Sequence, residues 1–275
     1  MRIDSHQHFW IYQPETHSWI DDRMHVLRRD FLPAELETHL SQCGVAGCVA
    51  VQAAQSLEET RWLLRLADRH EFIRGVVGWV DLVAPDLLDT LEELSSHARF
   101  KGVRHIVQSE ADGFLENPAF QRGVAALARF GLTYDILIYA HQLPAALEFV
   151  ARLPGVRFVL DHLAKPDLRR GELEPWATAM GRIAAHPNVC CKLSGLVTEA
   201  VWGAWQQRDL LPFLDTALEA FGADRLLFGS DWPVCMLAAS YDAVVETIEQ
   251  YVQRLGPPEQ AAILGGNATR VYRLS

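Results

Sequence analysis

The sequence predicts one α/β domain of the (β/α)8, or TIM-barrel, class that covers residues 1–275. Two observations support this class: the chain has the length of a single barrel, typically about 250 residues, and strand-like and helix-like segments alternate from end to end. No linker or low-complexity tract divides the chain, and 49% of its residues are hydrophobic. The composition therefore supplies enough apolar surface for one large core.

Short apolar segments rich in β-branched residues are the candidate strands. They cover residues 2–6, 47–52, 73–80, 102–106, 133–138, 157–161, 189–193 and 226–229. Helix-like stretches include residues 57–71, 117–130 and 210–221. The second of these begins with Asn117 and Pro118, a typical helix start, and the last two stop before a glycine. Repeated strand-then-helix order predicts a parallel sheet.

The alternative fold is a doubly wound nucleotide-binding sheet, which requires a glycine-rich turn after the first strand. The corresponding segment here is His6-Gln7-His8-Phe9-Trp10. This segment has no glycine to admit a phosphate, so the sequence favours the barrel.

The charge of the chain excludes several classes of partner. With 25 Lys and Arg against 35 Asp and Glu, the formal net charge is −10. An acidic protein repels nucleic acid and anionic membranes, whereas a neutral small molecule is not repelled. The five cysteines are odd in number and include an adjacent pair, which argues against a disulfide framework. We expect a cytoplasmic monomer or homodimer that acts on a small molecule.

The most informative pattern lies in the first predicted strand, Ile3-Asp4-Ser5-His6-Gln7-His8. Side chains two residues apart on a strand point to the same side, so His6 and His8 share one face. At the carboxyl end of a barrel strand both face the mouth, where catalytic groups collect. Two imidazoles there can bind a transition metal or donate hydrogen bonds to an anionic intermediate. The alternative is a pair of surface histidines near the chain terminus.

Three other predicted strands also end in polar groups. The fourth contains Arg104 and His105, the sixth ends at Asp161 and His162, and the eighth is followed by Ser230 and Asp231. A helix cap explains Ser230 or Asp231 alone, but not polar groups at the ends of four strands. In a closed barrel these groups converge on one cavity.

The segments RIDSHQHFW, GVRH, DHLAKP, CKLSGLVTEA and LLFGSDWPVC span residues 2–235. On these motifs the whole chain resembles the amidohydrolase superfamily, in particular the amidohydrolase 2 branch that contains sugar lactonases. The resemblance implies catalytic roles for His6, His8, His162 and Asp231. The aspartate would take a proton from the attacking water and return it to the leaving group, while the histidines hold a divalent metal or act without one.

Two departures from the binuclear members of that superfamily bear on the metal. Those members carry a carboxylated lysine at the end of strand four and a histidine at the end of strand five. This chain has Arg104-His105 and Ile138-Tyr139 there, and Lys101 lies at the entry of strand four. We therefore expect one divalent ion, with zinc as the first candidate, or none. The ligands would come from His6, His8, His162 and Asp231.

The implied reaction is hydrolysis of a sugar (aldono)lactone, of the L-fucono- or L-rhamnono-lactone kind, to the open acid. Asp231 is the expected general base and then acid, and Arg104 can stabilise an oxyanion if no metal is present. Aromatic and polar residues near strand ends are further candidates for binding the sugar. These candidates are Trp10, Gln52, Trp79, Arg104, Asp135, Lys192, Ser194 and Trp232.

Two other functions remain open at this point. One is a metal-dependent decarboxylase, or another hydrolase, of the same superfamily. The other is a barrel that binds a sugar without catalysis. Carbon dioxide release identifies the decarboxylase, and an Asp231→Asn variant separates binding from turnover.

Overall fold

The computed structural model describes residues 1–275 and contains one parallel sheet in which the eight strands follow their order in the sequence. The strands are β1 (Asp4–Gln7), β2 (Cys48–Val51), β3 (Ile73–Gly78), β4 (Phe100–His105), β5 (Thr133–Ile136), β6 (Arg157–Leu160), β7 (Val189–Leu193) and β8 (Leu226–Phe228). Each of the eight predicted strands is present, although most are shorter than predicted.

The sheet closes between β1 and the segment that follows β8. The His8 amide donates to the Trp232 carbonyl (2.7 Å), and the Asp231 amide donates to the His6 carbonyl (2.8 Å). Gln7 and Trp232 also form a parallel bridge. The predicted (β/α)8 barrel is therefore confirmed, and its closing seam carries His6, His8 and Asp231.

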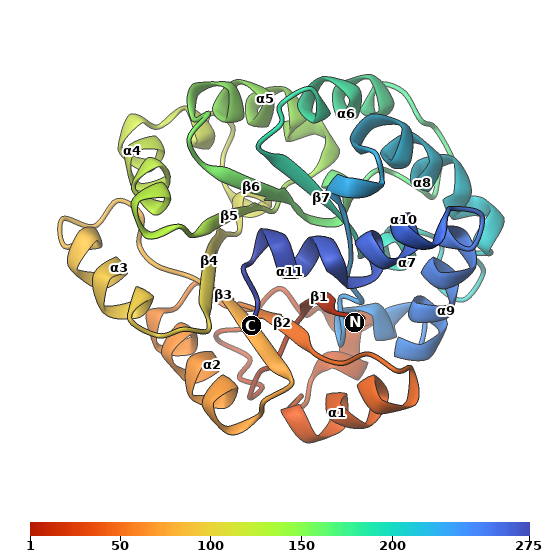
Figure 1. Ribbon diagram of the computed structural model, residues 1–275, viewed down its shortest axis with the longest axis horizontal. Helices are drawn as coiled ribbons and strands as arrows, with labels where there is room; N and C mark the ends of the chain where they lie inside the picture. Colours follow the sequence, from red (N-terminus) through yellow and green to blue (C-terminus); the bar gives the residue numbers. More distant parts are fainter.

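Helices surround the barrel (Figure 1). They are α1 (Pro33–Gln42), α2 (Leu57–Arg69), α3 (Leu87–Ser95), α4 (Pro118–Ala126), α5 (Leu143–Arg152), α6 (Trp176–Ala184), α7 (Leu196–Glu199), α8 (Gln207–Phe221) and α9 (Tyr241–Val252). The predicted helix at 117–130 divides, because α4 tightens into a 3-10 turn over Leu127–Phe130 before Gly131, whose φ is 68°. None of the helices is long and apolar enough to cross a membrane.

The predicted strands 73–80 and 133–138 each end two residues early, at Gly78 and Ile136. The residues that misled the prediction, Val80 and Ile138, are almost fully buried in the hydrophobic core without belonging to a strand. Their apolar character reflects burial and not strand pairing.

The C-terminal segment covers the amino-terminal end of the barrel. Helices α10 (Pro257–Ala261) and α11 (Asn267–Val271) cross this end, where both termini also lie (Figure 1). Cations from the starts of strands bind carbonyls at the end of α11: Arg157 donates to Val271 (2.8 Å) and Lys101 to Arg273 (2.9 Å). Such contacts satisfy free carbonyls at a helix carboxyl end.

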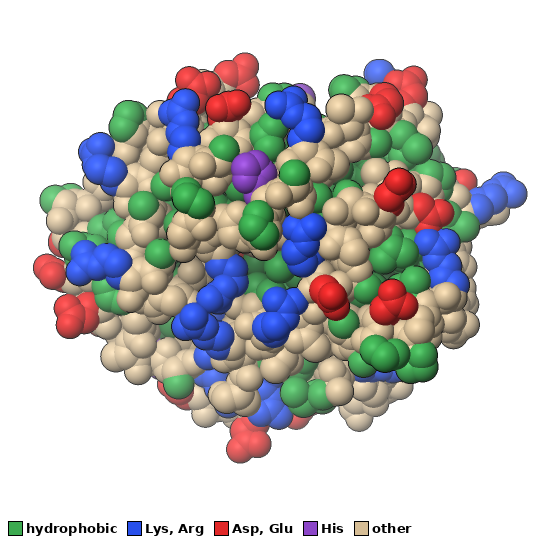
Figure 2. All heavy atoms as spheres, turned by 45° about the horizontal axis from the view of Figure 1, so that its top comes forward, with side chains coloured by type: hydrophobic (Ala, Val, Ile, Leu, Met, Phe, Trp, Pro, Cys, Tyr) green, Lys and Arg blue, Asp and Glu red, His purple; other side chains and the backbone are tan.

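In Figure 2 Lys and Arg side chains gather near the middle of the visible face. The opposite end of the barrel is left for a cavity.

Candidate active site

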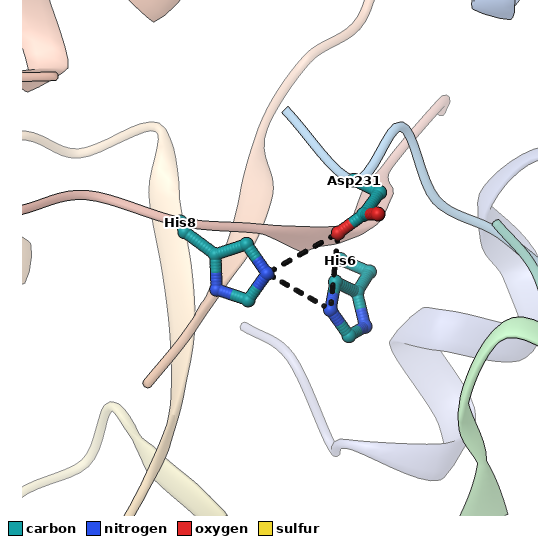
Figure 3. Close-up of side chains that lie close together, drawn as sticks. All are labelled: His6, His8 and Asp231. Carbon is teal, nitrogen blue, oxygen red and sulfur yellow. Dashed lines mark hydrogen bonds and ion pairs between the residues drawn. The ribbon is translucent and has the colours of Figure 1, made fainter. Parts of the chain in front are cut away.

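The four predicted catalytic side chains meet at the carboxyl end of the barrel. One carboxylate oxygen of Asp231, Oδ1, lies 3.3 Å from His8 Nε2, 3.8 Å from His6 Nε2 and 3.9 Å from His162 Nε2. Figure 3 shows His6 and His8, on and just after β1, pointing toward Asp231. All four side chains are buried. The prediction that the ends of strands one, six and eight meet is confirmed; the catalytic roles stay predictions.

Unusual backbone geometry aims two of these side chains. His162, Leu163, Ala164 and Lys165 follow β6 with φ values of 53°, 52°, 57° and 51°, and Asp231 has φ 59°. A left-handed conformation costs a residue other than glycine roughly 1–2 kcal/mol. The structure holds this turn in place, because the indole of Trp176 donates to the Leu163 carbonyl (2.7 Å). Backbone strain of this kind is concentrated at functional sites.

Glycine permits the close packing of one imidazole. A Cβ atom on Gly195, which follows β7, would lie 2.5 Å from His162 Nδ1. The ring therefore packs directly on the backbone, and its Nδ1 lies 2.9 Å from Ser194 Oγ. These contacts leave His162 Nε2 directed at Asp231.

The donor atoms of this cluster suit a divalent metal. His8 Nδ1 lies 2.8 Å from the Val51 carbonyl, which can only accept, so Nδ1 carries the proton and Nε2 offers a lone pair. That lone pair faces the Asp231 carboxylate at 3.3 Å and His6 Nε2 at 3.2 Å. Ligand atoms around a tetrahedral zinc ion, at about 2.0–2.1 Å from it, lie roughly 3.3 Å apart. His6, His8 and Asp231 thus have the spacing and chemistry of a metal site.

The proton on His6 has two possible positions. Its Nδ1 lies 3.1 Å from Lys192 Nζ and 3.3 Å from Asp161 Oδ1. If Nδ1–H donates to Asp161, Nε2 offers a lone pair to a metal. If Nδ1 accepts from Lys192, Nε2 carries the proton and can donate to an oxyanion. The same ring therefore serves either chemistry.

Burial and neighbouring groups set the ionisation of the cluster. Burial lowers the pKa of His162 to about 4, and burial together with the Lys192 charge lowers the pKa of His6 well below its usual value. Burial by itself would raise the pKa of Asp231, but at the low pH where a carboxyl group titrates the His162 imidazole carries a positive charge, which together with a hydrogen bond from His8 outweighs burial and holds this pKa below its usual range. Near neutral pH the site therefore presents the ionised carboxylate of Asp231 beside the neutral imidazoles of His6 and His162, as a general base or a metal ligand set requires.

A buried ionic network lies beneath the cluster. Lys192 Nζ is 2.7 Å from Asp135 Oδ2 and 2.9 Å from Asp161 Oδ1, and Arg104 Nη1 is 3.1 Å from Asp161 Oδ2. The hydroxyl of Tyr272, in the C-terminal segment, donates to Asp135 (2.6 Å). Two cations balance two carboxylates, which lets these charges remain in the interior. Two members of the network, Lys192 and Asp161, contact His6 Nδ1 and so fix the orientation of this ring.

A cavity of about 720 Å³ opens above the cluster, a size typical of small-molecule sites. His8, His162 and Asp231 line it together with Trp10 and Arg104. Its wall includes an apolar part, formed by Met24, Val234 and Leu237, and a polar part formed by Lys165, Thr198 and Glu199. Such a mixed wall fits a sugar, which has both carbon and hydroxyl faces.

Of the predicted sugar-binding residues, Trp10 and Arg104 line this cavity. Asp135 and Lys192 do not line it, because they are fully buried and pair with each other below the cavity; their role as substrate contacts stays a prediction. Ser194 lies behind His162 and contacts its Nδ1. Gln52 is also fully buried, and its backbone carbonyl accepts from Arg104.

The two other predicted tryptophans, Trp79 and Trp232, do not line the cavity. Trp232 is fully buried and packs edge-on against Phe31, with ring centroids 5.3 Å apart. Trp79 donates from its indole to His105 Nδ1 (3.3 Å), on the helix side of the sheet. His105 itself pairs with Glu110 there (2.8 Å), because side chains alternate along β4 and Arg104 takes the inward position.

Sequence reasoning missed Lys165 and Glu199, both of which line the cavity. Lys165 belongs to the DHLAKP segment, but nothing in its spacing indicates the left-handed turn that brings it to the cavity. Glu199 ends the short helix α7, which the strand and helix patterns did not predict.

Comparisons with known proteins identify the family of this chain. Residues 3–274 match the family model described as Amidohydrolase. The chain is 44% identical to an L-fucono-1,5-lactonase of Burkholderia multivorans (strain ATCC 17616 / 249), over 100% of this chain and 96% of that protein. It is 41% identical to an L-fucono-1,5-lactonase of Burkholderia ambifaria, over 99% and 96%. A crystal structure of a Burkholderia multivorans amidohydrolase with bound zinc superposes with a TM-score of 0.96, at 44% identity and 100% coverage of both chains.

Proposed function

The chain belongs to the amidohydrolase family, and from this premise we propose that it hydrolyses a sugar (aldono)lactone to the open acid, with L-fucono-1,5-lactone as the first candidate substrate. One observation carries the proposal: an ionised carboxylate, Asp231, faces three imidazoles at the floor of a cavity of sugar size. The full-length similarity to L-fucono-1,5-lactonases supports the choice of substrate.

In the proposed reaction, water attacks the lactone carbonyl carbon and the bond from that carbon to the ring oxygen breaks. Asp231 takes a proton from the water and returns it to the departing ring oxygen, which becomes a hydroxyl group. A positioned base and acid of this kind contributes about 100- to 10,000-fold to the rate. The products are a carboxylate and one released proton.

The remaining members of the cluster act on the carbonyl oxygen, where negative charge develops. His162 and Arg104 line the cavity and supply hydrogen-bond donors for this oxygen. Loss of one such donor commonly costs about 3 kcal/mol of transition-state stabilisation. Burial of the cluster strengthens these interactions, because little water competes for the same groups.

We propose zinc as the ion of this site, held by His6, His8 and Asp231 with His162 facing them. When bound, zinc polarises the carbonyl group and lowers the pKa of water to about 7. The crystal structure of the similar Burkholderia protein with zinc supports this choice. A cytoplasmic location belongs to the same proposal, since all five cysteines are free thiols, as is usual in a reducing compartment.

A pH-indicator assay with a panel of aldonolactones tests the function. We expect L-fucono-1,5-lactone to release acid without carbon dioxide, and we expect a chelator to abolish the activity and zinc to restore it. Metal content is measured on the same samples. Failure of every lactone in the panel would refute the proposed function, and release of carbon dioxide from an aromatic acid would identify a decarboxylase instead.

A further inference from the structure

Two charged side chains in the cavity wall face each other without touching. Lys165 ends the left-handed turn after β6, and Glu199 ends α7. Lys165 Nζ lies 3.9 Å from Glu199 Oε1, beyond hydrogen-bond distance, and the two side chains are only 18% and 24% exposed. Both line the cavity. The pair is therefore largely withdrawn from bulk solvent, and neither charged group makes a hydrogen bond to another protein group.

A gap of this size fits one hydroxyl oxygen. A single oxygen can lie about 2.8 Å from both atoms, accepting from the ammonium group and donating to the carboxylate. Hydrogen bonds to ionised partners are about twice as strong as neutral ones. One hydroxyl group of a neutral, hydroxylated ligand therefore forms hydrogen bonds with both charged groups at once. An apolar group in the same place would leave both charges without a hydrogen-bond partner.

The surroundings hold both groups in place before a ligand arrives. The strained turn that positions His162 also positions Lys165, whose ammonium lies 5.4 Å from the centre of the Tyr139 ring. The Thr198 hydroxyl donates to the Gly195 carbonyl (2.7 Å) and secures the first turn of α7. Burial raises the pKa of Glu199, although the Lys165 charge opposes this rise. Binding of a hydroxyl group therefore costs little conformational entropy of the Lys165 and Glu199 side chains.

We propose that Lys165 and Glu199 form a subsite for a ring hydroxyl of the substrate, so that the enzyme selects hydroxylated lactones over unsubstituted ones. The inference rests on the proposed lactone hydrolysis and adds the group by which the lactone is recognised. The apolar part of the wall around Met24, Val234 and Leu237 offers no hydrogen bond, so the hydroxyl-bearing edge of the ring is favoured on the polar part, to which the charged pair belongs.

The test compares two six-membered lactones, L-fucono-1,5-lactone and the unsubstituted δ-valerolactone. The proteins are the wild type, Lys165→Met, Glu199→Gln and the double variant, with Glu219→Gln, an exposed substitution on α8, as the control. A hydrogen bond to a charged group is worth about 1.5–3 kcal/mol, so each single variant should lose roughly 10- to 100-fold in kcat/KM on the hydroxylated lactone. The loss should appear mainly in KM, and the double variant should lose little more because both groups hold one hydroxyl.

Turnover of δ-valerolactone should change less than threefold in every variant, which also shows that the folded site is intact. Equal loss on both lactones would overturn the subsite and leave the lactonase function standing. Unchanged kcat/KM on the hydroxylated lactone would overturn the subsite as well. If the wild type hydrolyses no lactone at all, the proposed function fails and the subsite fails with it.

Discussion

Replacement of Lys192 by methionine tests the buried network beneath the site. Methionine keeps much of the volume and removes the charge. The lysine is fully buried and lies within 2.9 Å of two carboxylates, those of Asp135 and Asp161. In the Lys192→Met variant Asp161 still has its ion pair with Arg104, so the negative charge left without a partner is mainly that of Asp135. Removal of one partner from a buried ion pair typically destabilises a protein by about 3–5 kcal/mol.

The assay is unfolding by urea and by heat, with the protein freed of metal so that ion binding does not contribute. For a chain of this length 1 kcal/mol corresponds to about 2–4 °C in Tm, so Lys192→Met should lower Tm by roughly 10 °C. The double variant Lys192→Met/Asp135→Asn should recover part of this loss, because the unpaired charge is gone. A loss below about 1 kcal/mol, or no recovery in the double variant, would refute the account of the network.

Two further predictions concern groups behind the cavity wall: Glu59, whose carboxylate accepts from the backbone amides of Ala53 and Ala54, and Trp176, which holds the turn after β6. Burial raises the pKa of Glu59 from 4.5 to about 7, so the folded state binds this proton more tightly and loses stability as pH rises from 4.5 through 7; Glu59→Gln should remove a loss on the order of 3 kcal/mol. Urea unfolding midpoints of the wild type and of Glu59→Gln, each at pH 5 and pH 8, measure this loss. If the midpoints of the two proteins change equally between these pH values, the prediction is contradicted. Trp176→Phe removes the bond to the Leu163 carbonyl and should lower kcat/KM at least tenfold, an order-of-magnitude expectation for a displaced catalytic group. The matched variant Trp205→Phe, which loses a similar indole–carbonyl bond outside the cavity lining, should stay within twofold; equal activity of the two variants would count against the strained turn.

The fold and the central cluster could be predicted because both depend on regular spacing. Parallel strands bring their carboxyl ends to one rim, so His6, His8, His162 and Asp231 converge as soon as the barrel closes. The i, i+2 spacing of the two histidines survives errors of one or two residues in the strand bounds. The order of strands and helices along the chain and the topology of the barrel were sufficient to predict the fold and this cluster.

The rest of the site depends on side-chain direction, which the sequence does not specify. Proximity to a strand end did not show that Lys192 points below the cavity floor or that Trp232 turns into the core. The left-handed turn that brings Lys165 to the cavity is imposed by tertiary contacts such as the Trp176 bond. Domain number and catalytic roles stay predictions.

The rate of acid release from L-fucono-1,5-lactone by Asp231→Asn, compared with wild type at equal metal content, tests the central claim most directly. The amide keeps the shape of the side chain and cannot take the proton from water. We predict a fall of about 100- to 10,000-fold in kcat. A variant that keeps more than about a tenth of the wild-type kcat would show that Asp231 is not the base, and the account of the site would be wrong.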